Sequence, residues 1–186
     1  MNFIATKSRV LNRGIPPDSF LQNLVSWAKD APESLFTPRP DDHGETDIYT
    51  DVKPQLGPWT SLLHRKVAMC EVLRVLAGFE SSWRPSTGAD TTNPAENDDE
   101  TYSAGLWQIS YNSRGFGVDL REYLVQHEVT NGAVFQQRMK TDFDFAATYT
   151  AMLLRHTIRH NGPVKRHEIN PWLSRAAVAE FEQLLA

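Results

Sequence analysis

Residues 70–85 read CEVLRVLAGFESSWRP, and they combine the apolar spacing of a buried helix with a single acid near its end. Cys70, Leu73 and Leu76 recur every three residues, which places them on one face of a helix. Glu80 follows Leu76 by four residues and therefore returns to the same face. The stretch predicts a carboxylate at the C-terminal end of a buried helix.

A carboxyl group in that position has an unusual proton affinity. Burial disfavours its charged form, and the negative end of the helix dipole acts in the same direction, so both effects raise the pKa. An acid of this kind keeps its proton near neutral pH and can donate it. A solvated glutamate, or one that holds the following loop by hydrogen bonds, is the structural alternative, and position alone leaves both open.

The apolar pattern predicts a mainly α architecture of one compact unit. The chain has 186 residues, enough for a single core without a metal or a disulfide. Helices are expected at 16–30, 59–82, 133–160 and 170–186, with Asp18 as the N-cap of the first and Asn170, before Pro171, as that of the last. Residues 31–58 contain Pro32, Pro38, Pro40, Pro54 and Pro58 and predict an irregular arm, whereas the polar residues 86–105 predict a loop or small hairpin. Residues 1–58 are thus expected to pack on a main unit formed by residues 59–186.

Composition excludes several classes of function. The net charge of -4 provides no basic surface for nucleic acid or an anionic membrane. The single cysteine, Cys70, is expected to be a buried thiol and not a nucleophile. The first residues lack the apolar run of a Sec signal peptide, and no apolar stretch long enough to span a membrane follows. We therefore expect synthesis in the cytoplasm and no membrane insertion.

Two short motifs connect Glu80 with a family. GFESSW at 78–83 is followed by SAGLWQIS at 103–110, and the pair resembles the signature of the lysozyme-like superfamily, especially lytic transglycosylases and goose-type lysozymes. Glu80 and Ser81 match the catalytic Glu-Ser element, Gly105, Leu106 and Gln108 match the Gly-Leu-Met-Gln segment, and Trp107 stands where Met is usual. RHNGPVK at 159–165 resembles the family's Tyr-Asn-Ala-Gly-Pro turn, with His160 in the tyrosine's place, Asn161, Gly162 and Pro163 matching, and the alanine missing.

The resemblance implies an α+β lysozyme-like fold and cleavage of the β-1,4 bond between N-acetylmuramic acid and N-acetylglucosamine. Glu80 would be the general acid. The substrate would lie along Ser81, Tyr102, Gly105, Leu106, Trp107, Gln108, His160 and Asn161. Trp83, Tyr102 and Trp107 offer flat faces suited to sugar rings, and Gly105 would let the backbone approach a ring closely. No metal or other cofactor is implied.

The second carboxylate is less defined. An inverting hydrolase needs a base that holds water, whereas a lytic transglycosylase uses the glutamate alone. The loop offers Asp90, Glu96, Asp98, Asp99 and Glu100. Asp90 is the first choice because it lies nearest Glu80 in sequence, with Asp98 and Asp99 next; Ser110 stands where goose-type enzymes carry a further acid. A solvated loop, or a calcium site of Asp98, Asp99 and Glu100, is the alternative.

Other classes of function remain as alternatives. His156 and His160 are one helical turn apart, and with His127 or His167 they could form a zinc site, but Thr157 occupies the position of a metalloprotease base. A cysteine peptidase built on Cys70 and His64 is disfavoured, because side chains six residues apart on one helix do not meet. A non-catalytic carbohydrate-binding or immunity-like module would keep the fold without the chemistry.

The expected partners follow from the hypothesis that the protein is a muramidase. They are peptidoglycan glycan strands and a cognate inhibitor or immunity protein. An enzyme of this kind without a Sec signal would suit an antibacterial effector delivered to the periplasm by a secretion system, or an endolysin released to the cell wall through a holin.

Overall fold

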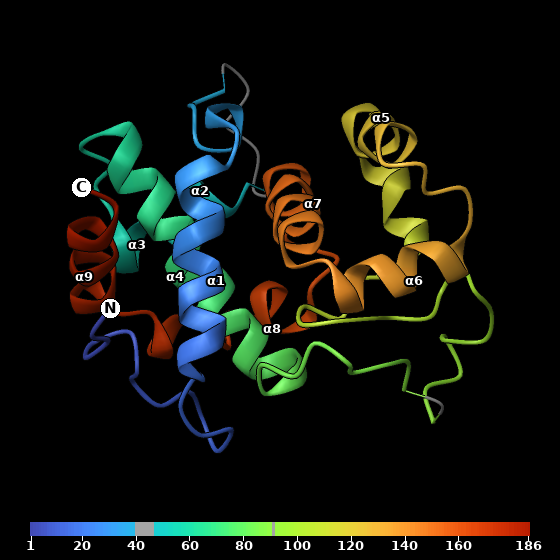
Figure 1. The fold of residues 1–186 in the computed structure, drawn as a ribbon, viewed down its shortest axis with the longest axis horizontal. Helices are drawn as coiled ribbons and strands as arrows, with labels where there is room; N and C mark the ends of the chain where they lie inside the picture. Colours follow the sequence, from blue (N-terminus) through green and yellow to red (C-terminus); the bar gives the residue numbers. More distant parts are fainter. Residues whose placement is uncertain (40–46, 91) are drawn as a thin grey trace.

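The computed structural model describes residues 1–39, 47–90 and 92–186, and this part of the chain is mainly helical, as predicted (Figure 1). The α-helices are α1 (Asp18–Asp30), α2 (Ile48–Asp51), α3 (Lys53–Leu56), α4 (Leu62–Ser81), α5 (Val118–Gln126), α6 (Gly132–Thr141), α7 (Phe143–His156), α8 (Gly162–Lys165) and α9 (Arg175–Leu185). Short 3-10 turns occur at η1 (Glu33–Leu35), η2 (Tyr111–Phe116) and η3 (Asn170–Trp172). Among the described residues, no helix has both the length and the apolar character that crossing a membrane requires.

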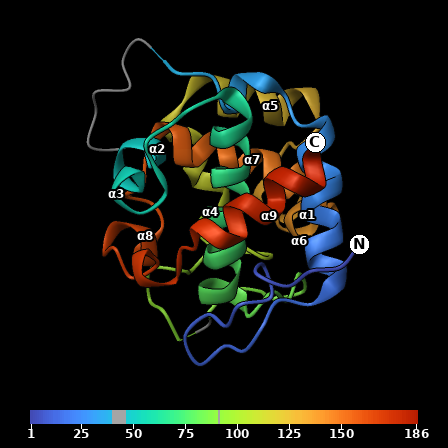
Figure 2. The same ribbon diagram turned by 90° about the vertical axis from the view of Figure 1, so that its left-hand side faces the viewer.

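Helix α4 is the central element of the fold. It packs against α1, α7, α8 and α9, and Figure 2 shows it running through the middle of the molecule. The Ser61 side chain accepts a hydrogen bond from the His64 N–H, so the helix begins at Leu62, slightly after the predicted start. At the other end Ser82 adopts a left-handed conformation with φ of 53°. This turn stops the helix one residue after Glu80 and redirects the chain into the loop.

Three predicted helix boundaries or caps differ in the structure. The expected helix 133–160 is divided into α6 and α7, because Asp142 is extended and its carboxylate accepts from the Phe145 N–H. Asn170 is not the cap of the last helix: it begins η3, and Ser174 caps α9. Asp18 is the first helical residue and not the N-cap, and its carboxylate pairs with Lys7 at 2.6 Å.

The predicted irregular arm is a series of short helical turns attached to the core. It contains η1, α2 and α3, while Pro40 lies outside the described residues. Buried Arg155 of α7 holds it, since its Nε donates to Asp47 at 2.9 Å and its Nη1 donates to the carbonyls of Leu35 and Thr37 at 2.8 and 3.0 Å. The arm thus contacts the helical core through an ion pair and hydrogen bonds that the sequence pattern did not reveal.

Two features lie inside α4. Glu71 and Arg74 form an ion pair at 2.7 Å with both side chains 0% exposed. Glu71 also accepts from the Ser174 N–H, and Arg74 donates to the carbonyl of Ser8, so the pair connects both ends of the chain to α4. Cys70 is a fully buried free thiol whose pKa burial raises to about 12. The expectation of a buried cysteine is confirmed.

The polar segment after α4 forms a long loop. Residues 82–110 contain no helix among those described, and a single β-bridge joins Ala104 to Ile109. This bridge is the only trace of the predicted hairpin in the described residues, and the rest is loop (Figure 1).

Candidate active site

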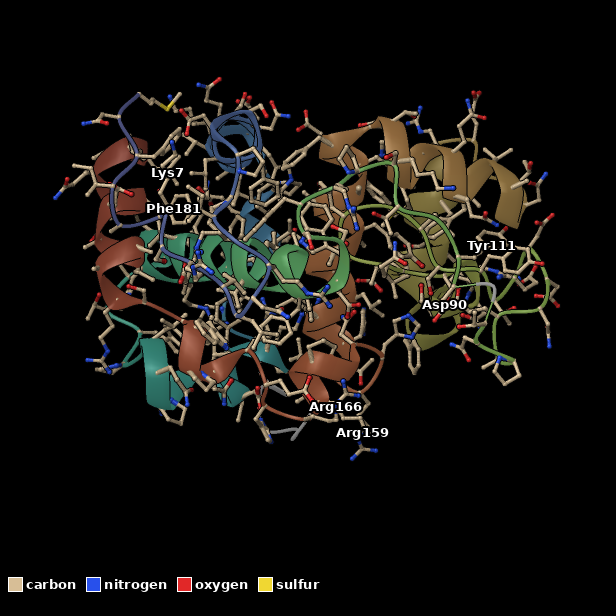
Figure 3. All side chains as sticks on the ribbon, turned by 90° about the horizontal axis from the view of Figure 1, so that it is seen from below. Lys7, Asp90, Tyr111, Arg159, Arg166 and Phe181 are labelled. Carbon is tan, nitrogen blue, oxygen red and sulfur yellow. The ribbon has the colours of Figure 1, made fainter. Side chains whose placement is uncertain are left out.

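Glu80 lies in the wall of an open cavity at the C-terminal end of α4. The cavity has a volume of about 850 Å³. Its wall comprises Leu11, Arg13, Phe79, Glu80, Asp90, Asn93, Glu96, Ser103, Gln108, His160, Asn161, Gly162, Pro163, Arg166, Glu168 and Trp172. Figure 3 shows the molecule from below. It labels Asp90, which belongs to the loop, and Arg166, which directly follows α8. Segments far apart in sequence therefore meet around the predicted acid.

The surroundings of Glu80 favour its protonated form. Burial raises the pKa of Glu80 to about 7, and the nearby carboxylates of Glu168 and Glu96 act in the same direction. The guanidinium groups of Arg166 and Arg13 oppose this rise without cancelling it. Glu80 is thus an acid that holds a proton up to neutral pH and is still reachable from solvent.

Three residues that the resemblance placed along the substrate lie in the core instead. Ser81 is buried, and its hydroxyl donates to the carbonyls of Ala77 and Leu106 at 3.1 and 2.8 Å, which fastens the loop to the end of α4. Leu106 is buried, and Trp107 is 0% exposed with its indole N–H donated to the Leu73 carbonyl at 2.9 Å. None of the three lines the cavity, so their part is to position the loop.

Gly105, Tyr102 and Trp83 also lie away from the cavity wall. A Cβ on Gly105 would lie 2.3 Å from the Met139 carbonyl oxygen, and its φ is +77°, so glycine is required for packing against α6 and not for approach to a sugar. Tyr102 belongs to the loop but not to the wall. Trp83 is buried, with its indole N–H donated to the Arg74 carbonyl at 2.9 Å. The predicted aromatic platform is therefore absent from the described cavity wall.

Three other predicted residues do reach the cavity. The amide of Gln108 donates to the carbonyls of Gly105 and Thr87 at 2.9 and 3.3 Å, so its N–H groups brace the loop. Burial lowers the pKa of His160, which keeps the ring neutral at pH 7. Asn161 is 2% exposed, and its Nδ2 has no hydrogen-bond partner among the described residues. An unpaired buried amide is costly to the folded state.

The structure separates the loop acids into two groups. Asp90 lines the cavity, and hydrogen bonds from the side chain and N–H of Thr92, at 2.6 and 2.9 Å, lower its pKa. Glu96 also lines the cavity and accepts from the N–H groups of Asp90 and Ser103 at 3.2 and 3.0 Å. Both face the same space as Glu80. Glu96 was only one of several acids in the sequence, and no spacing signal distinguished it.

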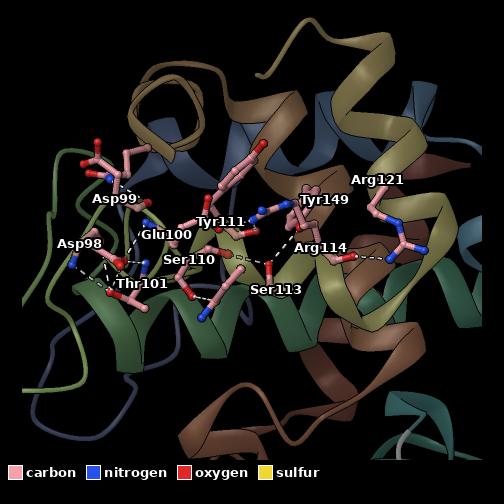
Figure 4. Close-up of polar contacts among 12 residues, drawn as sticks. Asp98, Asp99, Glu100, Thr101, Ser110, Tyr111, Ser113, Arg114, Arg121 and Tyr149 are labelled. Atoms are coloured by element: carbon pink, nitrogen blue, oxygen red, sulfur yellow. Dashed lines mark hydrogen bonds and ion pairs between the residues drawn. The ribbon is translucent and has the colours of Figure 1, made fainter. Parts of the chain in front are cut away.

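Asp98 and Asp99 are the other group, and their choice as second carboxylates is not supported by their place in the fold. Neither lines the cavity. Asp98 accepts from the hydroxyl of Thr101 at 2.9 Å and from the N–H groups of Glu100 and Thr101 at 3.0 Å, so it closes a local turn (Figure 4). Glu100 pairs with Arg114 of η2. These contacts brace the loop against η2.

The residues that suggested a metal are engaged elsewhere. In the described part of the chain, no group of three or more His, Cys, Asp or Glu side chains is placed to hold a metal ion. His156 pairs with Asp119 at 2.5 Å, whereas the His160 ring meets the edge of Phe116 with centroids 5.6 Å apart. The two histidines of the alternative zinc site therefore contact two different partners.

Two basic residues of the wall had no signal in the sequence. Arg166 is bound to Glu168 through two hydrogen bonds of 2.7 and 3.1 Å. Arg13 belongs to the N-terminal segment, which the family motifs do not include. The sequence motifs therefore did not predict that Arg166 and Arg13 lie beside Glu80.

No protein-family model, curated protein or solved structure matches this chain. The chemistry that the cavity can support therefore follows from its own residues. It combines a proton donor with a pKa of about 7, an acid whose pKa is lowered, and an unpaired buried amide. Such a set suits acid-base chemistry on a polar substrate that carries hydrogen-bonding groups.

Proposed function

We propose that this protein is a peptidoglycan-cleaving muramidase of lysozyme-like fold, with Glu80 as the general acid. The observation that carries the proposal is the raised pKa of Glu80, about 7, in an open cavity that also contains loop carboxylates. The motifs around Glu80 and Gln108 support the choice of a glycan substrate. The volume of about 850 Å³ is large enough for sugar units to enter.

In the proposed reaction Glu80 donates its proton to the oxygen of the β-1,4 bond as the bond to the anomeric carbon breaks. The carboxylate of Asp90 or Glu96 removes a proton from a water molecule that attacks that carbon. The products are a new reducing end and a free hydroxyl. Asn161 can donate its unpaired N–H to an acetamido carbonyl of the glycan, which would offset the cost of burying it.

The second candidate is a lytic transglycosylase with the same Glu80. The exposure of Asp90 favours it, because a solvated, strongly ionised carboxylate is a weak base. In this mechanism Glu80 acts as both acid and base, and a hydroxyl of the substrate attacks in place of water. Mass spectrometry of the products separates the two: a reducing end identifies the hydrolase and an anhydro end the transglycosylase.

The decisive experiment replaces the proton donor. Glu80→Gln keeps the size of the side chain but removes its transferable proton, so turnover of purified peptidoglycan should fall by about 10² to 10⁴. Release of soluble muropeptides measures the rate, and circular dichroism verifies the fold. Glu182→Gln is the matched control, since Glu182 is an exposed helical glutamate on α9, and it should retain wild-type activity.

Two outcomes would contradict the proposal. Near-native turnover by folded Glu80→Gln would show that another group supplies the proton. Binding of peptidoglycan by the wild-type protein without cleavage would favour the non-catalytic carbohydrate-binding module.

The proposed biological role is that of an antibacterial effector or endolysin that acts on the cell wall. Its partners would be peptidoglycan glycan strands and a cognate inhibitor or immunity protein. Lysis of target cells when the enzyme is directed to the periplasm, and its loss in Glu80→Gln, tests this role.

A further inference from the structure

The N-terminal segment supplies part of the cavity wall. Residues 10–14 form a turn in which the Val10 N–H donates to the Gly14 carbonyl and the Arg13 N–H donates to the Val10 carbonyl, both at 3.0 Å. Gly14 has φ of +96°, a conformation that glycine adopts without strain. Leu11 and Arg13 of this turn line the cavity. A segment outside the resemblance to lysozyme-like enzymes thus contributes directly to the site.

The residues that lead into this turn are anchored to two helices, α9 and α4. The Glu180 carboxylate of α9 accepts the N–H groups of residues 4, 5 and 6 at 2.7, 3.2 and 2.7 Å. Arg74 of α4 donates to the carbonyl of Ser8 at 3.1 Å, and Val10 is fully buried. These contacts hold residues 10–14 against α4. The backbone that carries Arg13 to the cavity wall is therefore fixed by hydrogen bonds to two helices.

Arg13 is the basic side chain of the wall that is available to a ligand. Its guanidinium makes no hydrogen bond or ion pair with another described residue, whereas that of Arg166 is held by Glu168. The carboxylates of Asp90 and Glu96 come from the loop. Figures 1 and 3 show this loop and the N-terminal segment on different sides of the end of α4. An anionic group of a ligand would therefore be attracted to the Arg13 side and repelled from the loop side.

We propose that Arg13 binds a carboxylate of the glycan and makes the cavity select acidic glycans over neutral ones. This inference rests on the proposed function. A guanidinium binds a carboxylate through two parallel hydrogen bonds, which gives both affinity and orientation. N-Acetylmuramic acid carries such a group, either on its lactyl ether or on the peptide attached to it, whereas a chitin-like strand carries none. Arg13 would thus fix which sugar lies on its side of Glu80.

The test uses glycan strands freed of their peptides, in which the lactyl carboxylates are exposed, and the same strands after the carboxylates are amidated. Wild-type kcat/KM should be about tenfold or more higher on the free carboxylates, with the difference mainly in KM. Arg13→Gln should show equal values on both substrates, close to the wild-type value on amidated strands. Arg9→Gln, which alters an exposed arginine of the same segment outside the wall, should behave as wild type.

A third substrate identifies the source of the carboxylate. Strands with intact peptides have blocked lactyl groups but free peptide carboxylates, so a preference of the wild type for these strands over their amidated form assigns the peptide as the source. If Arg13→Gln retains the full wild-type preference, or if the wild type cleaves free and amidated forms equally well, then the inference is wrong and the proposed function stands. Failure of the wild type to cleave any of the strands overturns the proposed function itself.

Discussion

A single side chain, Glu80, combines two properties that are rarely found together. It is buried deeply enough for its pKa to reach about 7, yet it faces a cavity open to solvent. Here Arg166 and Arg13 act from nearby but do not prevent the rise. The molecule therefore maintains an acid at a cost to its own folding, as expected of a functional group.

That cost predicts a pH-dependent effect of Glu80→Gln on stability. The folded-state pKa is above the unfolded value of 4.5, so the wild type loses folding free energy as pH rises from about 4.5 to above 7, while the neutral glutamine does not. At pH 8 the variant should be more stable by about 1–3 kcal/mol, and at pH 4 the two proteins should be equal. Urea denaturation at both pH values measures the difference. An identical gap at pH 4 and pH 8 would show that Glu80 has an ordinary pKa.

The loop acids provide a second prediction at this scale. If the enzyme is a hydrolase with its base in the cavity, Asp90→Asn or Glu96→Gln should lower turnover by about 10² to 10⁴. Asp98→Asn and Asp99→Asn serve as controls from the same loop and should retain wild-type rates, because neither residue lines the cavity. Thermal melts of all four variants separate lost chemistry from lost fold. Full activity in both Asp90→Asn and Glu96→Gln would favour the transglycosylase.

What the sequence could predict differs from residue to residue. The position of Glu80 could be predicted because the period of a helix fixes which face of the helix a residue occupies. Trp107 was misread because a motif gives the order of residues but not the direction of a side chain, and its indole is bonded to the Leu73 carbonyl inside the core. Glu96 and Arg13 could not be found, since each reaches the cavity through a non-periodic segment. Positions in loops depend on long-range contacts that local pattern does not encode.

At the scale of elements, the interface between the loop and α6 depends on one glycine. Gly105→Ala would force a Cβ to 2.3 Å from the Met139 carbonyl oxygen at a φ of +77°, so we expect a loss of more than about 2 kcal/mol of stability. Gly115→Ala is the control, because nothing lies within 4 Å of its Cβ and its cost should be below about 0.5 kcal/mol. Chemical denaturation provides both values. A stable Gly105→Ala protein with lost activity would instead indicate the sugar contact that the family resemblance implies.

Helix positions were more predictable than helix ends. The buried face of α1 follows from its apolar spacing, whereas α4 is buried on all sides from residue 67 to residue 78. The ends depend on which Ser, Asp or Asn turns its side chain back to the backbone, and several candidates often stand close together. Ser174 and not Asn170 caps α9, because Asn170 is already part of the 3-10 turn that brings the chain to Glu71.

At the scale of the whole molecule, the sequence pattern could not predict how distant segments pack together. Glu71 and Arg74 look like an ordinary surface pair three residues apart on a helix, yet both are fully buried. The N-terminal segment and the residues before α9 cover them, and each supplies a backbone group to the pair. Mainly helical architecture could be predicted from periodicity, but this closure of the two chain ends over α4 could not.

The burial of α4 also determines the reactivity of the Cys70 thiol. It is the only sulfhydryl group of the chain, and it lies at the centre of α4 with a pKa of about 12. Because the thiolate is the form of cysteine that attacks alkylating reagents, the native protein should be inert towards them, and reaction requires an opening that exposes the helix. With a single cysteine, the chain cannot form an internal disulfide. The time course of thiol alkylation under native conditions therefore reports how often the core opens, without any engineered label.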